Sequence, residues 1–440
     1  MINAIDLSPH QDGKAYLAVT GYKLNDFKPY IYRTTNYGSR WRRIDRGLPD
    51  GAFVRVVRED PVVPGLLYAG TEKGIFVSFD DGRAWQSLDL NLPAVPVTDL
   101  QAREDGLAVA TQGRAFWVLD DLWSLRQASA DLSTKDLHLF TPPKWVLGKP
   151  RVRSVLFEGA NPSPNLPLYY VIGKEVDADA ELTLEIFDAE GALIRTYSSV
   201  EGQQEQCEKN NEDPRRPIKQ TYAPAKQGFN RWHWDLRSED VPCIDDILLQ
   251  PGFAGPKVAP GQYRARLTLG EASSDVDFVL EKDSRGFASD DQITQWAIAL
   301  NEVKSLLAQT LLALDNARLA RRQVASLLQS HREPELIELG RAAKTAIDEW
   351  EAKITQLKFE TYEDEDAYPT LFDGQVRYLM DTIDFSGAPV TDGMRTRKKD
   401  LEVQWIDLKA ELSEIKGRFV DPINEWARKR RAPHVKLSSP

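Results

Sequence analysis

The chain is poor in the residues that mark several classes of protein. Its 440 residues include two cysteines, three methionines and five histidines. The histidines are scattered, with no pair at i and i+4 and none beside a cysteine, so their spacing predicts no zinc site. The sequence also lacks a phosphate-binding glycine loop and a Gly-x-Ser-x-Gly nucleophile motif. We therefore expect no metal and no cofactor.

Long apolar runs and a positive net charge are missing as well. No run of 18 apolar residues is found, so we expect no membrane span. Residues 1–6 have neither the basic start nor the apolar core of a signal peptide. A net charge of −11 disfavours nucleic acid and anionic membranes as partners. The basic residues 428–431 are a local exception, which we interpret as the solvated end of a helix.

What the sequence does contain is a repeated eight-residue pattern. Residues 34–41 read TTNYGSRW and residues 78–85 read SFDDGRAW, so the two copies begin 44 residues apart. Both read Ser/Thr, any residue, Asp/Asn, any, Gly, any, any, Trp. A period of about 40 to 50 residues built from short strands is typical of a β-propeller, with one blade per repeat.

We interpret the eight residues as a structural turn. The glycine can take the positive φ that a tight turn needs, and the Asn or Asp can accept backbone N–H groups. The tryptophan can bury a large ring against a neighbouring hairpin. The residues with these structural roles are Thr34, Asn36, Gly38 and Trp41 in the first copy and Ser78, Asp80, Gly82 and Trp85 in the second.

Three groups of three short strands are predicted for residues 1–128. The expected strands are residues 2–7, 15–19 and 30–33, then 54–57, 66–69 and 74–77, then 97–100, 107–110 and 115–119. The third group has Asp120-Asp121-Leu122-Trp123 in place of the pattern, as a terminal blade would. Because propellers have about 4 to 8 blades, we expect an incomplete propeller that is the tail end of a longer protein.

The pattern resembles the Asp-box, or BNR repeat, of sialidases and sortilin-type (VPS10) ectodomains. Residues 70–82 and 110–121 are similar in wording to the bacterial sortilin-like group that is often labelled glycosyl hydrolase. That group usually has His-Gly-Arg-Gly where this chain has Gln112 and Ala115, so any role of the histidine is lost here. The resemblance implies a secreted or periplasmic protein; because no signal peptide is seen, a cytoplasmic location is the alternative.

A connecting segment, residues 129–164, precedes a second β-rich domain at residues 165–281. Its succession of strands resembles the FlgD-type Ig-like sandwich that follows the propeller in that bacterial group. Cys207 and Cys243 both fall in this domain. They form one disulfide in an oxidising compartment, or stay as two thiols otherwise. Aromatic residues of this domain could stack on sugars, but we interpret them as core: Tyr169, Tyr170, Trp232, Trp234 and Tyr263.

From residue 289 the apolar period changes from 2 to 3.6, which predicts helices to the end of the chain. Ser289 and Gln292 form a capping box at the start of the first helix. Further helices are expected from Pro334, over residues 375–383, and from Thr391 until Pro422 kinks or ends the last one. Residues 289–440 are predicted to be an antiparallel helical bundle, through which the chain could self-associate.

Candidate ligand-binding residues lie where the propeller strands would face the central channel: Arg55, Glu72, Asp99 and Arg114. Glycoside cleavage needs a pair of carboxylates about 5 to 10 Å apart, or in sialidases a tyrosine nucleophile with several arginines. The four candidates do not compose either set. We therefore predict a non-catalytic ligand-binding or scaffold portion of a sortilin-like propeller protein that recognises a glycan or a protein. The alternative is a glycosyl hydrolase whose catalytic residues lie in upstream blades.

Overall fold

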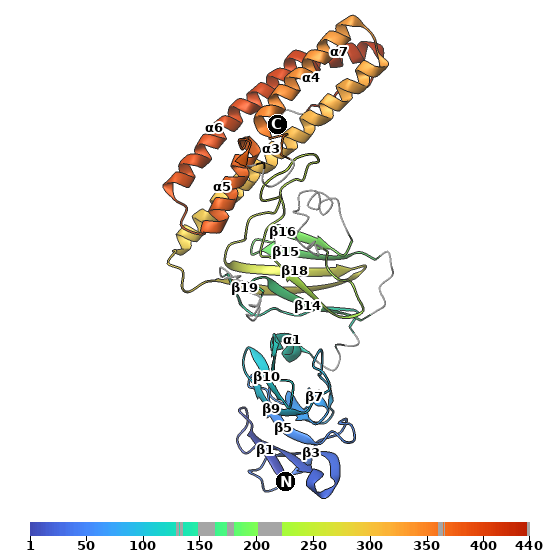
Figure 1. Ribbon diagram of the computed structural model, residues 1–440, viewed down its shortest axis with the longest axis vertical. Coiled ribbons are helices and arrows are strands. Elements are labelled where there is room, and N and C mark those ends of the chain that lie inside the picture. The colour runs from blue at the N-terminus through green and yellow to red at the C-terminus, as the bar shows by residue number, and fades with distance from the viewer. Residues whose placement is uncertain are drawn as a thin grey trace. The chain divides into compact units, whose positions relative to one another are not determined.

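The computed structural model describes the chain except residues 129–131, 133–134, 148–162, 174–179, 201–221, 360–363, 365 and 438–440 (Figure 1). The described residues divide into two compact units. The first comprises residues 1–143, 169–175 and 226–230, and the second comprises residues 144–168, 176–225 and 231–440. The fold is a mixture of several β-sheets and a C-terminal helical region, as predicted.

The first unit contains three antiparallel sheets in chain order. The first sheet has the order β1 (Ile2–Leu7), β2 (Ala15–Gly21), β3 (Asp26–Thr34) and β4 (Arg42–Arg43). The second has the order β5 (Val54–Glu59), β6 (Leu67–Thr71), β7 (Gly74–Ser78) and β8 (Gln86–Ser87). The third has the order β11 (Phe116–Asp120), β10 (Gly106–Thr111) and β9 (Val97–Ala102). Every strand predicted for this region overlaps an observed one.

These sheets pack face to face through two apolar layers. The layer between the first and second sheets includes Tyr16, Ala18, Ile31, Val57, Leu67 and Phe76. The layer between the second and third includes Val56, Tyr68, Val77, Val97, Leu100 and Leu107. Gly70 permits close approach in the second layer, because a Cβ there would lie 2.7 Å from Cγ1 of Val97. The middle sheet is therefore covered on both faces.

The outer faces of the first and third sheets have no neighbour among the described residues, and the three sheets form no closed ring. Leu7 pairs with Ala15 in the first sheet as Glu59 pairs with Leu67 in the second. Ile5 and Leu7 are therefore at positions equivalent to Val57 and Glu59, which are buried. Ile5 and Leu7 themselves are 60% and 73% exposed. On the third sheet, Phe116 and Val118 are 85% and 63% exposed. The number of blades in the protein therefore stays a prediction.

Short hydrogen bonds fix the two eight-residue turns, which we call the Asp-box turns. The Asn36 side-chain oxygen accepts the N–H of Arg40 at 2.9 Å, and that of Asp80 accepts the N–H of Ala84 at 3.0 Å. Gly38 and Gly82 have φ of +82° and +80°, a conformation that glycine adopts without strain. In the third sheet a short helix, α1 (Leu122–Gln127), stands in place of the turn.

Two further sheets follow in the chain. The five-stranded sheet has the order β13 (Trp145–Leu147), β19 (Ala272–Lys282), β18 (Gly261–Leu269), β15 (Leu182–Asp188) and β16 (Leu193–Ser198). The three-stranded sheet has the order β12 (Leu137–Leu139), β14 (Leu166–Ile172) and β17 (Gly228–Trp234). The predicted hairpin over residues 182–197 is present as β15 and β16. Assignment of this region to the Ig-like fold stays a prediction.

The aromatic residues of this region are core residues for the most part. Tyr169, Tyr170, Trp234 and Tyr263 are buried, and Trp232 is partly buried. The Trp234 ring packs edge-on against Tyr263, with centroids 5.8 Å apart. They therefore do not provide an exposed platform on which sugar rings could stack. Cys207 lies outside the described residues, so the Cys207–Cys243 disulfide stays a prediction.

The helical region contains α3 (Asp290–Ser330), α4 (Pro334–Ile354), α5 (Phe372–Ser386), α6 (Asp392–Ile415) and α7 (Asp421–Arg430). The predicted capping box of Ser289 and Gln292 is present at the start of α3. Pro422 does not end the last helix, because a π-helical turn, η4 (Lys416–Val420), joins α6 to α7 and places the proline in the first turn of α7.

Among the described residues, α3 is long enough and in one 18-residue window apolar enough to cross a membrane. Half of that window is buried inside the structure, and a core helix of a soluble protein passes the same test. The apolar side chains that α3 buries include Leu300, Val303, Leu307, Leu311 and Leu314. Length and composition of α3 therefore fit a core helix of this region as well as they fit a membrane span.

An irregular segment, residues 235–258, is tied to the helices by charged side chains. The Arg377 guanidinium on α5 donates to the Gly252 carbonyl at 2.6 Å. Arg237 forms an ion pair with Asp384 at 3.1 Å. Leu248 and Gln250 of this segment line the pocket described below.

Candidate functional site

Two of the predicted ligand-binding residues, Arg55 and Glu72, form an ion pair with each other. Nε and Nη2 of Arg55 lie 2.9 and 2.6 Å from Oε2 of Glu72. The Arg55 guanidinium also lies over the Phe53 ring, 5.2 Å from its centroid. The pair brings β5 together with the turn that follows β6. Neither charge of the pair is left uncompensated.

Asp99 belongs to a second group, which we call the inner-strand row: Asp6 on β1, Arg58 on β5 and Asp99 on β9. Nη2 of Arg58 donates to Oδ1 of Asp99 at 2.9 Å, and Nη1 lies 3.7 Å from Oδ1 of Asp6. Burial raises the pKa of Asp6, although the backbone N–H of Glu59 and the charge of Arg58 act against that rise. A single arginine thus joins the inner strands of all three sheets.

Arg114 stands apart from both groups. Its side chain is exposed in the turn between β10 and β11, and its carbonyl accepts the Nε1–H of Trp117 at 2.9 Å. The four predicted residues therefore do not meet in one constellation. Arg58 and Asp6 were not predicted from the sequence. The sequence signal that could have found them is their position: each is the residue before the last one of the first strand of its sheet, at equivalent places in successive sheets.

A buried polar network between the first and second sheets was also missed. Oε1 of Glu59 accepts from Nζ of Lys14 at 3.1 Å, from the Tyr16 hydroxyl at 3.2 Å and from the Gly65 N–H at 2.9 Å. The Tyr16 hydroxyl also donates to Asp81 at 2.6 Å, and burial raises the pKa of that phenol. Oε2 of Glu59 is buried and has no hydrogen-bond partner among the described residues. Because its members are largely buried, we interpret this network as an attachment between sheets.

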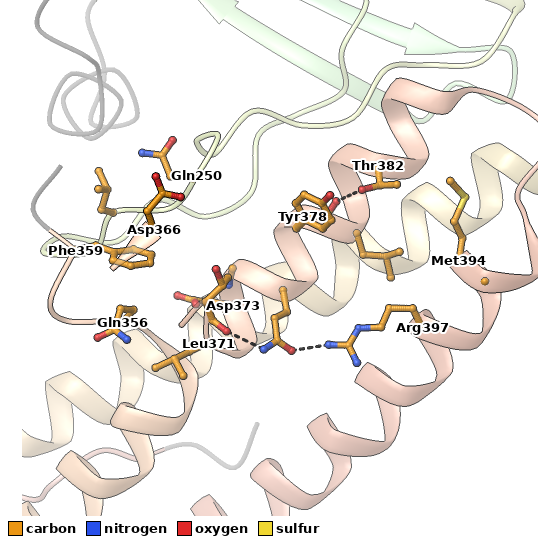
Figure 2. Close-up of a pocket in the computed structure, with 16 residues that line it drawn as sticks. Gln250, Gln356, Phe359, Asp366, Leu371, Asp373, Tyr378, Thr382, Met394 and Arg397 are labelled. Atoms are coloured by element: carbon orange, nitrogen blue, oxygen red, sulfur yellow. Dashed lines mark hydrogen bonds between the residues drawn. The ribbon is translucent and has the colours of Figure 1, made fainter. Parts of the chain in front are cut away.

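The second unit contains a pocket of about 670 Å³ (Figure 2). Its walls are α5, the start of α6, the residues after α4, and the segment around Gln250. Figure 2 shows Asp366, Asp373 and Arg397 among the side chains that line the space, together with Tyr378 and Met394. The lining thus combines two carboxylates, Asp366 and Asp373, and the Arg397 guanidinium with apolar and amide side chains.

Asp373 is a buried carboxyl in this lining, in the first turn of α5. It is 5% exposed. Burial raises its pKa to about 6, against the opposing effects of hydrogen bonds from the Thr355 side chain and the Gly374 N–H and of the Arg318 charge. The carboxyl is therefore largely ionised at neutral pH in spite of its burial, and the helix N-terminus contributes to its stabilisation.

Arg397 reaches the same pocket from α6 and is positioned by Gln375. Nη2 of Arg397 donates to Oε1 of Gln375 at 2.6 Å, while Nε2 of Gln375 donates to the Thr370 carbonyl at 2.8 Å. The amide is thereby oriented with its oxygen toward the guanidinium (Figure 2). Neither Asp373 nor Arg397 was singled out from the sequence, since an acid near a helix start and a basic residue in a charged run look like ordinary surface residues.

Within the part of the chain that the structure describes, no group of three or more His, Cys, Asp or Glu side chains is placed to hold a metal ion. The candidate sites for ligands bound by hydrogen bonds and charge are the inner-strand row and the pocket.

No protein-family model and no curated protein sequence matches the chain. Solved structures that match parts of it are of propeller-type proteins. An ancestral GH74 enzyme has 16% identity and a TM-score of 0.22 over 26% of this chain and 14% of its own. YCF48 from Cyanidioschyzon merolae has 14% identity and a TM-score of 0.17; the match covers 27% of this chain and 42% of the YCF48 chain. The GH74 xyloglucanase from Xanthomonas campestris has 12% identity and a TM-score of 0.22; the match covers 62% of this chain and 38% of the enzyme. The chain thus spans less than half the length of each of these.

Proposed function

We propose that the chain is a non-catalytic part of a sortilin-like Asp-box protein and that its inner-strand row binds a glycan. The observation that carries this proposal is the pairing of charges: Arg58 pairs with Asp99 in the row, and Arg55 pairs with Glu72 in the second sheet. A glycosidase needs one carboxyl with a raised pKa to protonate the leaving oxygen and a second carboxylate across the scissile bond. Burial raises the pKa of Asp6, but the Arg58 guanidinium lies 3.7 Å from Asp6 and 2.9 Å from Asp99, so the two carboxylates of the row are already bridged by a cation.

Paired charges are well suited to binding neutral sugar hydroxyl groups. An ion pair presents fixed donors and acceptors without a net charge, and its remaining lone pairs and N–H groups can bond a hydroxyl in either direction. The Asp99 side chain is 64% exposed and is therefore accessible for such contacts. Its Oδ1 accepts a hydrogen bond from Arg58 at the same time. Arg58 is held in place by its bond to the Leu100 carbonyl at 2.9 Å. The row is therefore a preorganised polar surface.

The proposal is tested by titrating the chain with a panel of neutral and sialylated oligosaccharides of plant and bacterial type. We expect at least one neutral glycan to bind, and Asp99→Asn to weaken its binding about tenfold, since losing a charged hydrogen bond costs about 1.5–3 kcal/mol. Arg83→Gln, an exposed arginine in the second Asp-box turn, is the matched control and should bind as the parent does. If only proteins bind, the glycan proposal fails in favour of a protein ligand.

A second candidate is a glycosyl hydrolase whose catalytic residues lie in Asp-box sheets outside these 440 residues. It is supported by the outer faces of the first and third sheets, where Ile5, Leu7, Phe116 and Val118 present apolar side chains to solvent. A further sheet on either face would bury them as the first sheet buries Val57 of the second sheet. Reading the gene upstream of the Met1 codon tests it: further Asp-box repeats with clustered carboxylates in frame support the enzyme, and a stop codon there contradicts it.

We further propose that the protein is secreted or periplasmic and that the helical region is a scaffold through which copies associate. Non-reducing peptide mapping should find Cys207 joined to Cys243 in native material; two free thiols would favour a cytoplasmic protein. Val403 and Ile406 on α6 are 52% and 60% exposed and offer an apolar contact surface. Light scattering should give a dimer that Ile406→Glu converts to a monomer, and a monomeric parent chain would contradict self-association.

A further inference from the structure

The pocket of the helical region is lined by three charged side chains, of which Asp366 is exposed. The other two, Asp373 and Arg397, lack charged partners among the described residues. Within the described residues, neither the Asp373 carboxylate nor the Arg397 guanidinium has an oppositely charged side chain within 4.0 Å. Asp373 is buried and Arg397 is partly buried, so neither charge is fully stabilised by water. A charge removed from water without a partner carries a desolvation cost that an incoming opposite charge can offset.

The two charges are fixed in place and separated along the pocket. Asp373 is held in the first turn of α5 by the Gly374 N–H and the Thr355 side chain. Arg397 is held by Gln375, whose other end is bonded to the Thr370 carbonyl. Only one of the five N–H groups of the Arg397 side chain is used in that bond, so the others remain for a ligand. Figure 2 shows the arginine extending from α6 toward α5 on this side of the pocket.

The rest of the lining is apolar or aromatic for much of its area. Leu371 and Leu379 on the α5 side and Met394 on α6 contribute aliphatic surface, and Tyr378 contributes a ring. Such a lining favours hydrocarbon over a second set of polar groups. The volume of about 670 Å³ is in the range of small-molecule sites and is much larger than a water molecule needs.

We propose that this pocket binds a small dipolar molecule, with an ammonium group on Asp373, a carboxylate on Arg397 and an apolar chain between them. A planar guanidinium with free parallel N–H groups matches a carboxylate in two-point contact. A buried carboxylate that is ionised near neutral pH matches an ammonium group. This site is independent of the glycan site proposed for the inner strands, and either proposal can fail without the other.

The probes are ω-amino acids from 4-aminobutanoate to 8-aminooctanoate, titrated calorimetrically into the full chain at pH 7.5. We expect a maximum of affinity at one chain length, where both charges are engaged at once. The matched n-alkylamine and n-alkanoate, each with one charge, should bind at least about tenfold more weakly, because each engages one end alone. Equal binding of the amine or the acid alone would overturn the dipolar assignment.

Variants assign each end. Arg397→Gln and Asp373→Asn should each lower the affinity for the best ω-amino acid about tenfold or more, whereas Arg395→Gln, an exposed residue two positions from Arg397, should leave it unchanged. Arg397→Glu provides a test that does not depend on loss of binding. It should reverse the preference, so that the α,ω-diamine of matched length binds more tightly than the ω-amino acid. No binding of any probe up to 10 mM, or an unchanged preference in Arg397→Glu, would overturn the proposal.

Discussion

The Trp85 indole donates its Nε1–H to the carbonyl of Ile44 at 2.6 Å, across 41 positions of sequence. This bond attaches the second Asp-box turn to the first sheet, and the Trp85 ring is buried in the apolar layer between the two sheets. Trp41 has the same place in the first Asp-box turn but is only partly buried, because no sheet covers that side of the first sheet. The tryptophan of the second Asp-box turn therefore contributes more to the free energy of unfolding than the tryptophan of the first.

Trp85→Ala should destabilise the first unit much more than Trp41→Ala. Removing a buried aromatic ring costs about 3–5 kcal/mol, whereas a half-exposed ring costs about 1 kcal/mol. The measurement is hydrogen exchange of peptides that cover β5–β7, followed by mass spectrometry, which reports opening of the second sheet. Similar loss of protection in both variants would contradict the difference between the two turns.

The glycines of the two turns provide a second matched pair. Both have positive φ, so substitution by alanine costs about 1–2 kcal/mol of backbone strain in each. A Cβ on Gly82 would also lie 2.5 Å from Cδ1 of Ile44, whereas a Cβ on Gly38 would meet nothing closer than 3.7 Å. Gly82→Ala should therefore cost about 1–3 kcal/mol more than Gly38→Ala in the free energy of unfolding. Equal costs in urea titrations followed by circular dichroism would show that Ile44 can move aside.

Features defined by a few neighbouring residues could be predicted from the sequence. The Asp-box turns are such a case, since their glycine, acid and tryptophan fall within eight residues, and so is the Ser289–Gln292 capping box. The strands β4 and β8 were missed because two residues carry no periodicity. Pro422 was predicted to kink or end the last helix, since a π-helical turn that accommodates it has no sequence signal of its own.

Contacts between distant residues could not be predicted in the same way. Lys14 and Glu59 are 45 positions apart, and each looks like a surface residue until the sheets are stacked. Glu72 and Arg55 were singled out as two candidates without a reason to pair them. The pocket depends on α5, α6 and the segment around Gln250, whose meeting is decided by tertiary packing of the helices. A single sequence contains no local pattern for such a meeting.

Lys14→Met should destabilise the attachment between the first and second sheets by about 3–5 kcal/mol. It leaves the buried Glu59 carboxylate without its cation, and one oxygen of that carboxylate already lacks a hydrogen bond. Lys28→Met, at an exposed position of β3, is the control and should change stability by less than about 0.5 kcal/mol. Urea titrations of both variants measure the difference. A neutral effect of Lys14→Met would contradict a role of the Lys14–Glu59 ion pair in attaching the two sheets.

Asp373 should make stability fall as the pH rises from about 4 to about 6. Its pKa in the folded chain is about 6, above the value of about 3.9 expected when unfolded. The folded state therefore binds the proton more tightly than the unfolded chain does. This difference adds up to about 3 kcal/mol to the free energy of unfolding; the contribution is complete below pH 4 and is lost as the pH rises through 6. The groups that act on the carboxyl are the Thr355 side chain, the Gly374 N–H and the charge of Arg318. The difference between the parent chain and Asp373→Asn, from thermal unfolding at several pH values, isolates the effect, and a difference that is independent of pH would contradict it.

The central claim is that the inner-strand row binds a glycan and does not cleave it. The most direct measurement incubates excess protein with a reducing-end-labelled oligosaccharide that binds, and analyses the sugar by mass spectrometry after dissociation of the complex. We expect the oligosaccharide to be recovered intact, with binding weakened by Asp99→Asn at the Arg58–Asp99 pair. Shortened labelled products that form with the parent chain and are lost in Asp99→Ala would contradict the claim.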